Sequence, residues 1–228
     1  MTWAVLKEGW AYRPSLGWYR WTGKRWETIG DATLLAAEIG RFFDAQNWQQ
    51  RNGGLYAYCQ EEMARRCFVP EPFWDSAHYL SFENGVLDTR DNSFHDHGPQ
   101  FYCTCSLPYA YDLAASCPNW LRYLGQATGE DQQLQQLLRA WCKWILSPKD
   151  RTRKSPIEKS LDLVGRKGSG KGTFLDILMQ LVGEENCGVS SPDTFSTPEG
   201  LGQLIDKKWP SIPTHPAICP ESAISTKS

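Results

Sequence analysis

The feature that most constrains the fold of this chain is a glycine-rich run at residues 165–173, Gly-Arg-Lys-Gly-Ser-Gly-Lys-Gly-Thr. Its first seven residues fit the G-x-x-x-x-G-K pattern of a phosphate-binding loop, which joins a buried strand to a helix. The short apolar run at residues 160–164 predicts that strand. Apolar residues recur with helical spacing after the loop, at Phe174, Ile177, Leu178, Leu181 and Val182. Gly183 predicts the helix end, so this region predicts the beginning of an α/β P-loop NTPase domain.

The loop residues predict a site for the phosphates of ATP. Glycines let the backbone curl, so that loop N–H groups and the helix N-terminus point at one anion. The residues expected to contact the nucleotide are Gly165, Gly168, Ser169, Gly170, Lys171, Gly172 and Thr173. Lys171 adds a point charge for the outer phosphates. The alternative is a glycine-rich turn that binds no ligand.

The loop departs from its pattern immediately after the lysine. The pattern places a Ser or Thr there as the Mg²⁺ ligand, whereas this chain has Gly172. Thr173 carries a hydroxyl one place later and is therefore the candidate Mg²⁺ ligand, directly or through water. The string Gly-Ser-Gly-Lys-Gly-Thr is similar to the loop of adenylate-kinase-type enzymes, so Gly172 is compatible with nucleotide binding.

Charge is unevenly distributed along the chain. The formal net charge of −2 argues against a protein coated by nucleic acid over its whole surface. Between residues 149 and 171, however, eight basic residues face three acidic ones. Three of the basic residues, Arg151, Arg153 and Lys154, lie in a polar linker at residues 148–159. These residues either contact DNA phosphates or belong to an ordinary solvated linker, and both interpretations stay open.

The cysteine pattern predicts reduced thiols in a cytoplasmic protein. The eight cysteines include no C-x-x-C pair, no signal peptide opens the chain, and no apolar run reaches the length of a membrane span. A weak zinc pattern is formed by His95-x-His97 and Cys103-x-Cys105, whose spacing is shorter than that of common zinc sites. The alternative is a hairpin with two polar histidines and two small core thiols.

An aromatic hairpin is predicted at residues 17–29, with its turn at residues 22–24. Aromatic and basic residues interleave there, which is typical of a stacking platform for single-stranded DNA. The candidate contacts are Trp21, Lys24, Arg25 and Trp26. The favoured alternative is that these aromatic side chains pack the hairpin itself.

The remaining sequence predicts an α+β N-terminal domain of β-hairpins and helices over residues 1–147. Helices are expected at residues 32–48, after an Asp31 N-cap, and at 55–67. Strands are expected at 78–82, 85–87 and 93–97. A helix begins at Pro118, and a longer one follows a capping box formed by Thr128 and Asp131 and ends at Pro148. The linker at 148–159 then leads to a partial P-loop domain at 160–208 and a proline-rich, disordered tail at 209–228.

Several motifs in this order resemble the phage and plasmid primase–helicase family. They are the Phe-Glu-Asn-Gly-Val-Leu-Asp segment at 82–88, His-Gly-Pro at 97–99, Leu-Pro-Tyr-Ala-Tyr-Asp at 107–112, Pro118 with Trp120, the long helix and the loop. The resemblance covers residues 17–208 and implies the domain that precedes a superfamily-3 helicase core, plus the start of that core. It implies an ATP- and Mg²⁺-dependent helicase that acts on DNA and self-associates into a ring.

The resemblance also implies what should follow the loop. In the family, an acidic strand, a polar sensor and an arginine finger come next, and the 20 proline-rich residues at the end of this chain leave no room for them. The sequence therefore predicts a truncated form that binds ATP weakly and hydrolyses it poorly. Two other functions stay open: a non-enzymatic module that binds single-stranded DNA or a replication partner, and a nucleoside monophosphate kinase.

Overall fold

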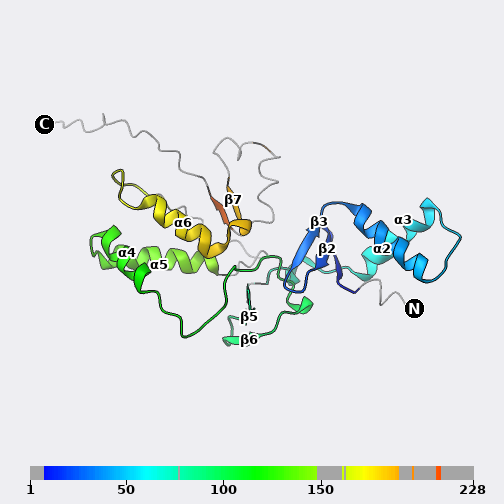
Figure 1. Cartoon of the computed structure of the whole chain (residues 1–228), viewed down its shortest axis with the longest axis horizontal. Helices are drawn as coiled ribbons and strands as arrows, with labels where there is room; N and C mark the ends of the chain where they lie inside the picture. Colours follow the sequence, from blue (N-terminus) through cyan, green and yellow to red (C-terminus); the bar gives the residue numbers. More distant parts are fainter. Residues whose placement is uncertain are drawn as a thin grey trace. The chain divides into compact units, whose positions relative to one another are not determined.

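The computed structural model describes residues 8–76, 78–147, 161, 163–189, 197 and 209–211 (Figure 1). The chain forms two compact units, Met1–Gly183 and Glu184–Ser228. The first unit mixes helices with two small antiparallel sheets, so the predicted α+β class of the N-terminal region is confirmed. The domain boundary predicted at 148–159 lies outside the described residues and stays a prediction.

The first sheet has three antiparallel strands in sequential order, β1 (Trp10–Arg13), β2 (Gly17–Trp21) and β3 (Trp26–Ile29). The predicted hairpin is confirmed as β2 and β3, in which Trp21 pairs with Trp26 across the turn. Gly23 has a φ of 95° in this turn, a conformation that glycine adopts without steric cost. Strand β1 was not predicted and extends the hairpin into a sheet.

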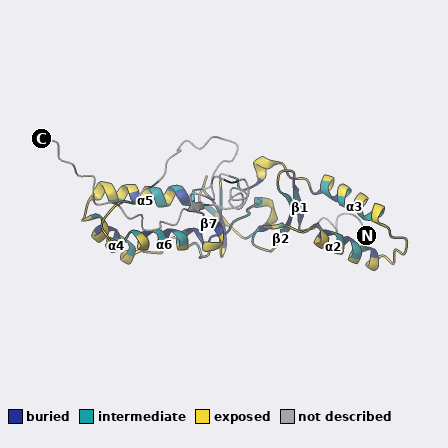
Figure 2. Cartoon of the chain, turned by 90° about the horizontal axis from the view of Figure 1, so that it is seen from above, coloured by how far each residue is buried: buried dark blue, intermediate teal, exposed yellow. Residues whose placement is uncertain are grey.

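Two helices follow the sheet, α2 (Ala32–Ala45) and α3 (Gly53–Arg66), as the sequence predicts. Asp31 caps α2 by accepting the Thr33 N–H, which confirms the predicted N-cap. Both helices show buried and exposed sides in Figure 2. Their buried sides meet in one apolar cluster with strand β1, made of Trp10, Leu35, Ile39, Phe43, Cys59, Met63 and Cys67.

The second sheet is formed by β4 (Tyr79–Phe82), β5 (Gly85–Asp88) and β6 (Ser93–His95), again antiparallel and sequential. The three predicted strands are therefore confirmed. Two short 3-10 helices flank the sheet in sequence, η1 (Glu71–Phe73) and η2 (Pro99–Phe101). Phe82 and Leu87 of this sheet pack with Leu107 from the segment that follows it.

Three helices complete the first unit, α4 (Pro118–Thr128), α5 (Gln132–Leu146) and α6 (Lys171–Val182). Helix α5 contacts both α4 and α6. The predicted capping box between these helices is wrong. Asp131, not Thr128, caps α5 by accepting the N–H groups of Gln133 and Leu134, while the Thr128 hydroxyl donates to Leu124 O inside α4. The stronger carboxylate acceptor thus takes the N-cap position.

The second unit contains η3 (Glu184–Asn186) and a parallel pair of strands, β7 (Cys187–Val189) and β8 (Trp209–Ser211). Strand β8 corrects the prediction that disorder begins at residue 209, because its backbone pairs with β7 despite Pro210. A proline is tolerated in such an edge strand. Across the described part of the chain, no helix has the length and apolar character needed to cross a membrane.

Candidate phosphate-binding site

The glycine-rich run forms a turn that leads directly into α6. Helix α6 begins at Lys171, and Gly170 is its N-cap with a φ of 88°. Gly168 also lies in the left-handed region, with a φ of 79°. In the described residues no side chain caps this helix end, so its first N–H groups retain their capacity to bind an anion.

Lys171 folds back over the loop that precedes it. Its Nζ donates to Gly165 O at 2.7 Å and to Arg166 O at 2.8 Å, and lies 3.3 Å from Ser169 Oγ. The ammonium group therefore lies against the first half of the loop, held by neutral oxygens. A phosphate oxygen would be a stronger acceptor for the same group, because the hydrogen bond would join opposite charges.

The loop has space on its open side. A Cβ atom added to Gly168 or Gly172 would meet no atom within 4 Å. All six residues from 164 to 169 and the pair 172–173 are exposed. An uncapped helix N-terminus, a nearby ammonium and open space fit a bound phosphate group, and the residues that would hold it are those predicted from the sequence.

Helix α4 contacts the loop through Tyr123. The Tyr123 hydroxyl donates to Gly170 O at 2.8 Å. Trp120 stacks on Tyr123 and also on Phe174 of α6, with centroid distances of 5.7 and 5.9 Å. Burial raises the pKa of Tyr123. The sequence did not reveal Tyr123 as part of the site; its only signal is its position three residues after Trp120 on one helix face.

The strand predicted at residues 160–164 is not formed at the residues of this segment that the structure describes. Residues 161 and 163–166 have no strand pairing. A buried strand would cover its apolar side chains, whereas Val164 is 93% exposed. Residues 160 and 162 lie outside the described residues. Among the residues that the structure describes, no α/β sheet of a P-loop domain lies around this loop, and the loop is contacted by helix α4 and continues into α6.

Thr173, the predicted Mg²⁺ ligand, is exposed in the first turn of α6. Within the described ranges no group of three or more His, Cys, Asp or Glu side chains could hold a metal ion. Thr173 can thus supply one hydroxyl ligand, with water and phosphate oxygens completing the shell that Mg²⁺ commonly keeps.

The predicted DNA contacts of the aromatic hairpin divide into two groups. Trp26 is only 4% exposed and donates its Nε1–H to Pro99 O at 2.9 Å, so it is a core residue rather than a surface for base stacking. Trp21 and Arg25 are partly exposed and Lys24 is exposed, and Arg25 also pairs with Glu27 at 2.9 Å. The linker residues Arg151, Arg153 and Lys154 lie outside the described residues.

The histidine and cysteine pairs do not converge on a metal site. His95 Nε2 lies 2.8 Å from Ser93 Oγ, and His97 Nε2 lies 3.2 Å from Glu83 O. Cys103 is buried and Cys105 is partly buried. The alternative interpretation, a hairpin with polar histidines, agrees with the pairing of β5 and β6.

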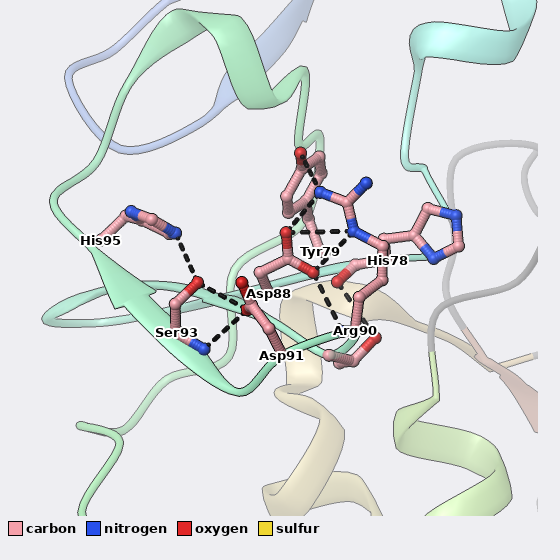
Figure 3. A network of polar contacts seen from close by, with 8 residues as sticks. His78, Tyr79, Asp88, Arg90, Asp91, Ser93 and His95 are labelled. Carbon is pink, nitrogen blue, oxygen red and sulfur yellow. Dashed lines mark hydrogen bonds and ion pairs between the residues drawn. The ribbon is translucent and has the colours of Figure 1, made fainter.

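The polar network on this hairpin, shown in Figure 3, centres on an ion pair rather than on a catalytic triad. Arg90 donates Nε to both carboxylate oxygens of Asp88 at 3.0 and 3.1 Å, and its Nη2 donates to Tyr79 at 3.1 Å. The hydrogen bonds from Arg90 lower the pKa of Asp88 to about 2. Ser93 lies between Asp91 and His95, so the histidine does not link the hydroxyl to the carboxylate as an acyl-transfer triad requires.

The motifs at 82–88 and 107–112 build the fold of the second sheet. The Asn84 side chain donates to Tyr111 O at 3.2 Å and accepts the Tyr111 N–H at 2.8 Å. A Cβ atom at Gly85 would collide with His95 O and the Phe94 ring. These contacts hold a tight turn against the segment that follows the sheet. A family model described as D5 N terminal like matches residues 2–129, which include both motifs.

Proposed function

This chain belongs to the D5 N-terminal-like family, and we propose that it is an ATP-binding DNA replication protein of a phage, a plasmid or another mobile genetic element. The family is found in phage and plasmid primase–helicase proteins. The matched residues end at 129, inside the turn between α4 and α5, and the glycine-rich loop follows in the same chain. This order is the one expected when a replication domain precedes a helicase-type ATPase segment.

The observation that carries the proposal is the position of the Lys171 ammonium group at an uncapped helix N-terminus, 2.7 and 2.8 Å from two loop carbonyl oxygens. Upon ATP binding, Lys171 exchanges these neutral acceptors for phosphate oxygens. The N–H groups at the start of α6 then donate to the same phosphates. Mg²⁺, when bound, neutralises phosphate charge, with Thr173 as the candidate hydroxyl ligand.

We propose that ATP binding by this chain is accompanied by little hydrolysis. Phosphoryl transfer depends on positioned charges that stabilise the transition state and orient the attacking water. Gly172 removes the hydroxyl that normally follows the loop lysine as a direct Mg²⁺ ligand. Lys171 and the backbone N–H groups therefore hold ATP, and turnover by the chain alone is expected to be slow.

Equilibrium binding of ATP tests this function. Lys171→Ala is expected to weaken ATP binding at least about tenfold, because it removes a charge-assisted hydrogen bond. Lys167→Ala is the matched control, since Lys167 is an exposed lysine on the same loop that does not follow the last glycine of the pattern. Equal loss in both variants would point to non-specific charge attraction, and rapid Lys171-dependent ATP hydrolysis would contradict slow turnover.

Single-stranded DNA binding is a second proposed function, favoured by the partly exposed Trp21 and the exposed Lys24 on one hairpin. Stacking on Trp21 and phosphate contact with Lys24 would give sequence-tolerant, salt-dependent binding. Trp21→Ala with Lys24→Ala should weaken binding to an oligothymidine, whereas replacement of the exposed Tyr58 on α3 should not. Unchanged affinity in the double variant would exclude the hairpin as the DNA contact.

A further inference from the structure

We infer that Tyr123 of α4 is a positioning residue that holds the phosphate loop in its binding geometry and thereby couples the loop to the family domain. The inference rests on the proposed ATP-binding function of the loop. Tyr123 lies inside the family match at residues 2–129, whereas the loop lies outside it. The contact therefore joins two segments that are separated by 47 positions in sequence.

The contact acts at the junction between the loop and α6. Gly170 O accepts the Tyr123 hydroxyl at 2.8 Å and the Phe174 N–H at 3.0 Å, which is the first backbone hydrogen bond of the helix. The peptide group is planar, so fixing the carbonyl of Gly170 also fixes the direction of the Lys171 N–H at the other end of the same peptide. That N–H is the first donor offered to a phosphate by α6.

The tyrosine ring is itself held in place. Trp120 stacks on the Tyr123 ring at an interplanar angle of 23° and on Phe174 at 24°, so aromatic contacts join α4 to the first turn of α6. The Tyr123 hydroxyl approaches the loop closely. A Cβ atom added at Gly170 would lie 3.3 Å from the hydroxyl oxygen. Glycine at this position thus permits both the left-handed backbone and the close approach of Tyr123.

The consequence is an energetic link between the ATP site and α4. If ATP binding requires the Gly170 geometry that Tyr123 stabilises, then bound ATP must in turn stabilise the contact with Tyr123. A ligand bound at the loop thereby stabilises the contact with α4, the last helix of the family domain. Loss of one neutral hydrogen bond predicts that ATP affinity falls about 3- to 10-fold.

The conservative variant Tyr123→Phe tests the inference, because it removes the hydroxyl and keeps the ring that stacks on Trp120. ATP and inorganic triphosphate are titrated into the full chain, with Tyr58→Phe as a control on an exposed tyrosine of α3. Affinity for both ligands should fall about 3- to 10-fold in Tyr123→Phe and stay unchanged in Tyr58→Phe. Unchanged or tighter binding in Tyr123→Phe would overturn the inference.

Hydrogen–deuterium exchange separates this inference from the proposed function. Without ligand, peptides that cover residues 165–174 should exchange faster in Tyr123→Phe than in the wild type; equal rates would overturn the positioning role. In the wild type, ATP should slow exchange in α4, and this effect should be lost in the variant. A wild type that binds no ATP would contradict the proposed function and the coupling, while faster exchange in the ligand-free variant would still support the loop contact.

Discussion

Replacement of Trp26 by phenylalanine tests whether the aromatic hairpin belongs to the core. The Trp26 indole is 4% exposed, and its Nε1–H donates to Pro99 O at 2.9 Å. Its ring also contacts Trp21, Trp74 and Tyr102, with centroid distances of 5.6, 6.0 and 6.0 Å. The substitution therefore removes a buried hydrogen bond and part of a ring that contacts three others.

The expected cost is about 2 kcal/mol in the free energy of unfolding. The lost hydrogen bond contributes about 1 kcal/mol, because the Pro99 carbonyl loses its donor. The smaller phenyl ring leaves a small cavity and weaker ring contacts, which cost about another 1 kcal/mol. Trp21→Phe, in the cross-strand partner that is only partly buried, should cost less than about 1 kcal/mol.

Urea unfolding followed by circular dichroism measures both variants. The midpoint should fall clearly for Trp26→Phe and little for Trp21→Phe, with the slope of the unfolding free energy against urea unchanged. The packing interpretation would be refuted if Trp26→Phe left the midpoint unchanged and abolished binding of single-stranded DNA. That result would make Trp26 a surface contact.

Three further predictions follow from the second sheet and the helices. Gly85→Ala should destabilise the chain by about 2 kcal/mol or more in thermal or urea unfolding, because the added Cβ meets His95 O and the Phe94 ring. Asp131→Ala should cost about 1 kcal/mol in the same assay through loss of the α5 N-cap. Hydrogen bonds from Arg90 lower the pKa of Asp88 to about 2. The ionised carboxylate therefore stabilises the fold fully above the unfolded pKa of about 4. This contribution is lost as the pH falls through about 2. Asp88→Asn should therefore flatten the pH dependence of stability between about pH 4 and 2; an unchanged slope would contradict that assignment.

Local patterns predicted much of the N-terminal fold. The β2–β3 hairpin, α2, α3 and the three strands of the second sheet each carry a turn signal, a cap or an apolar period within their own residues. Strand β1 was missed because its four residues lack a distinguishing pattern and are fixed by pairing with β2. The start of α5 was misplaced because Thr128 and Asp131 both have N-cap chemistry, and only the fold shows that Thr128 still belongs to α4.

The candidate site could be predicted from the sequence only where its residues are close together in the chain. The order of glycines and Lys171 within nine residues predicts the candidate phosphate loop from the sequence alone. The contact from Tyr123 to Gly170 depends on how α4 packs beside α6, and no sequence spacing encodes it. The burial of Trp26 likewise depends on Trp74, Tyr102 and Pro99, which lie far along the chain and enclose the indole.

The most direct test of the central claim is to observe the loop glycines while ATP is added. In protein labelled with ¹⁵N-glycine, the amide signals of Gly168, Gly170 and Gly172 should shift saturably with ATP, because the N–H groups of the loop and of the first turn of α6 surround the bound phosphates. The same signals should remain unmoved in Lys171→Ala over that concentration range. ATP binding that leaves the three amides unshifted, or equal shifts in Lys171→Ala, would contradict the assignment of this loop as the nucleotide site.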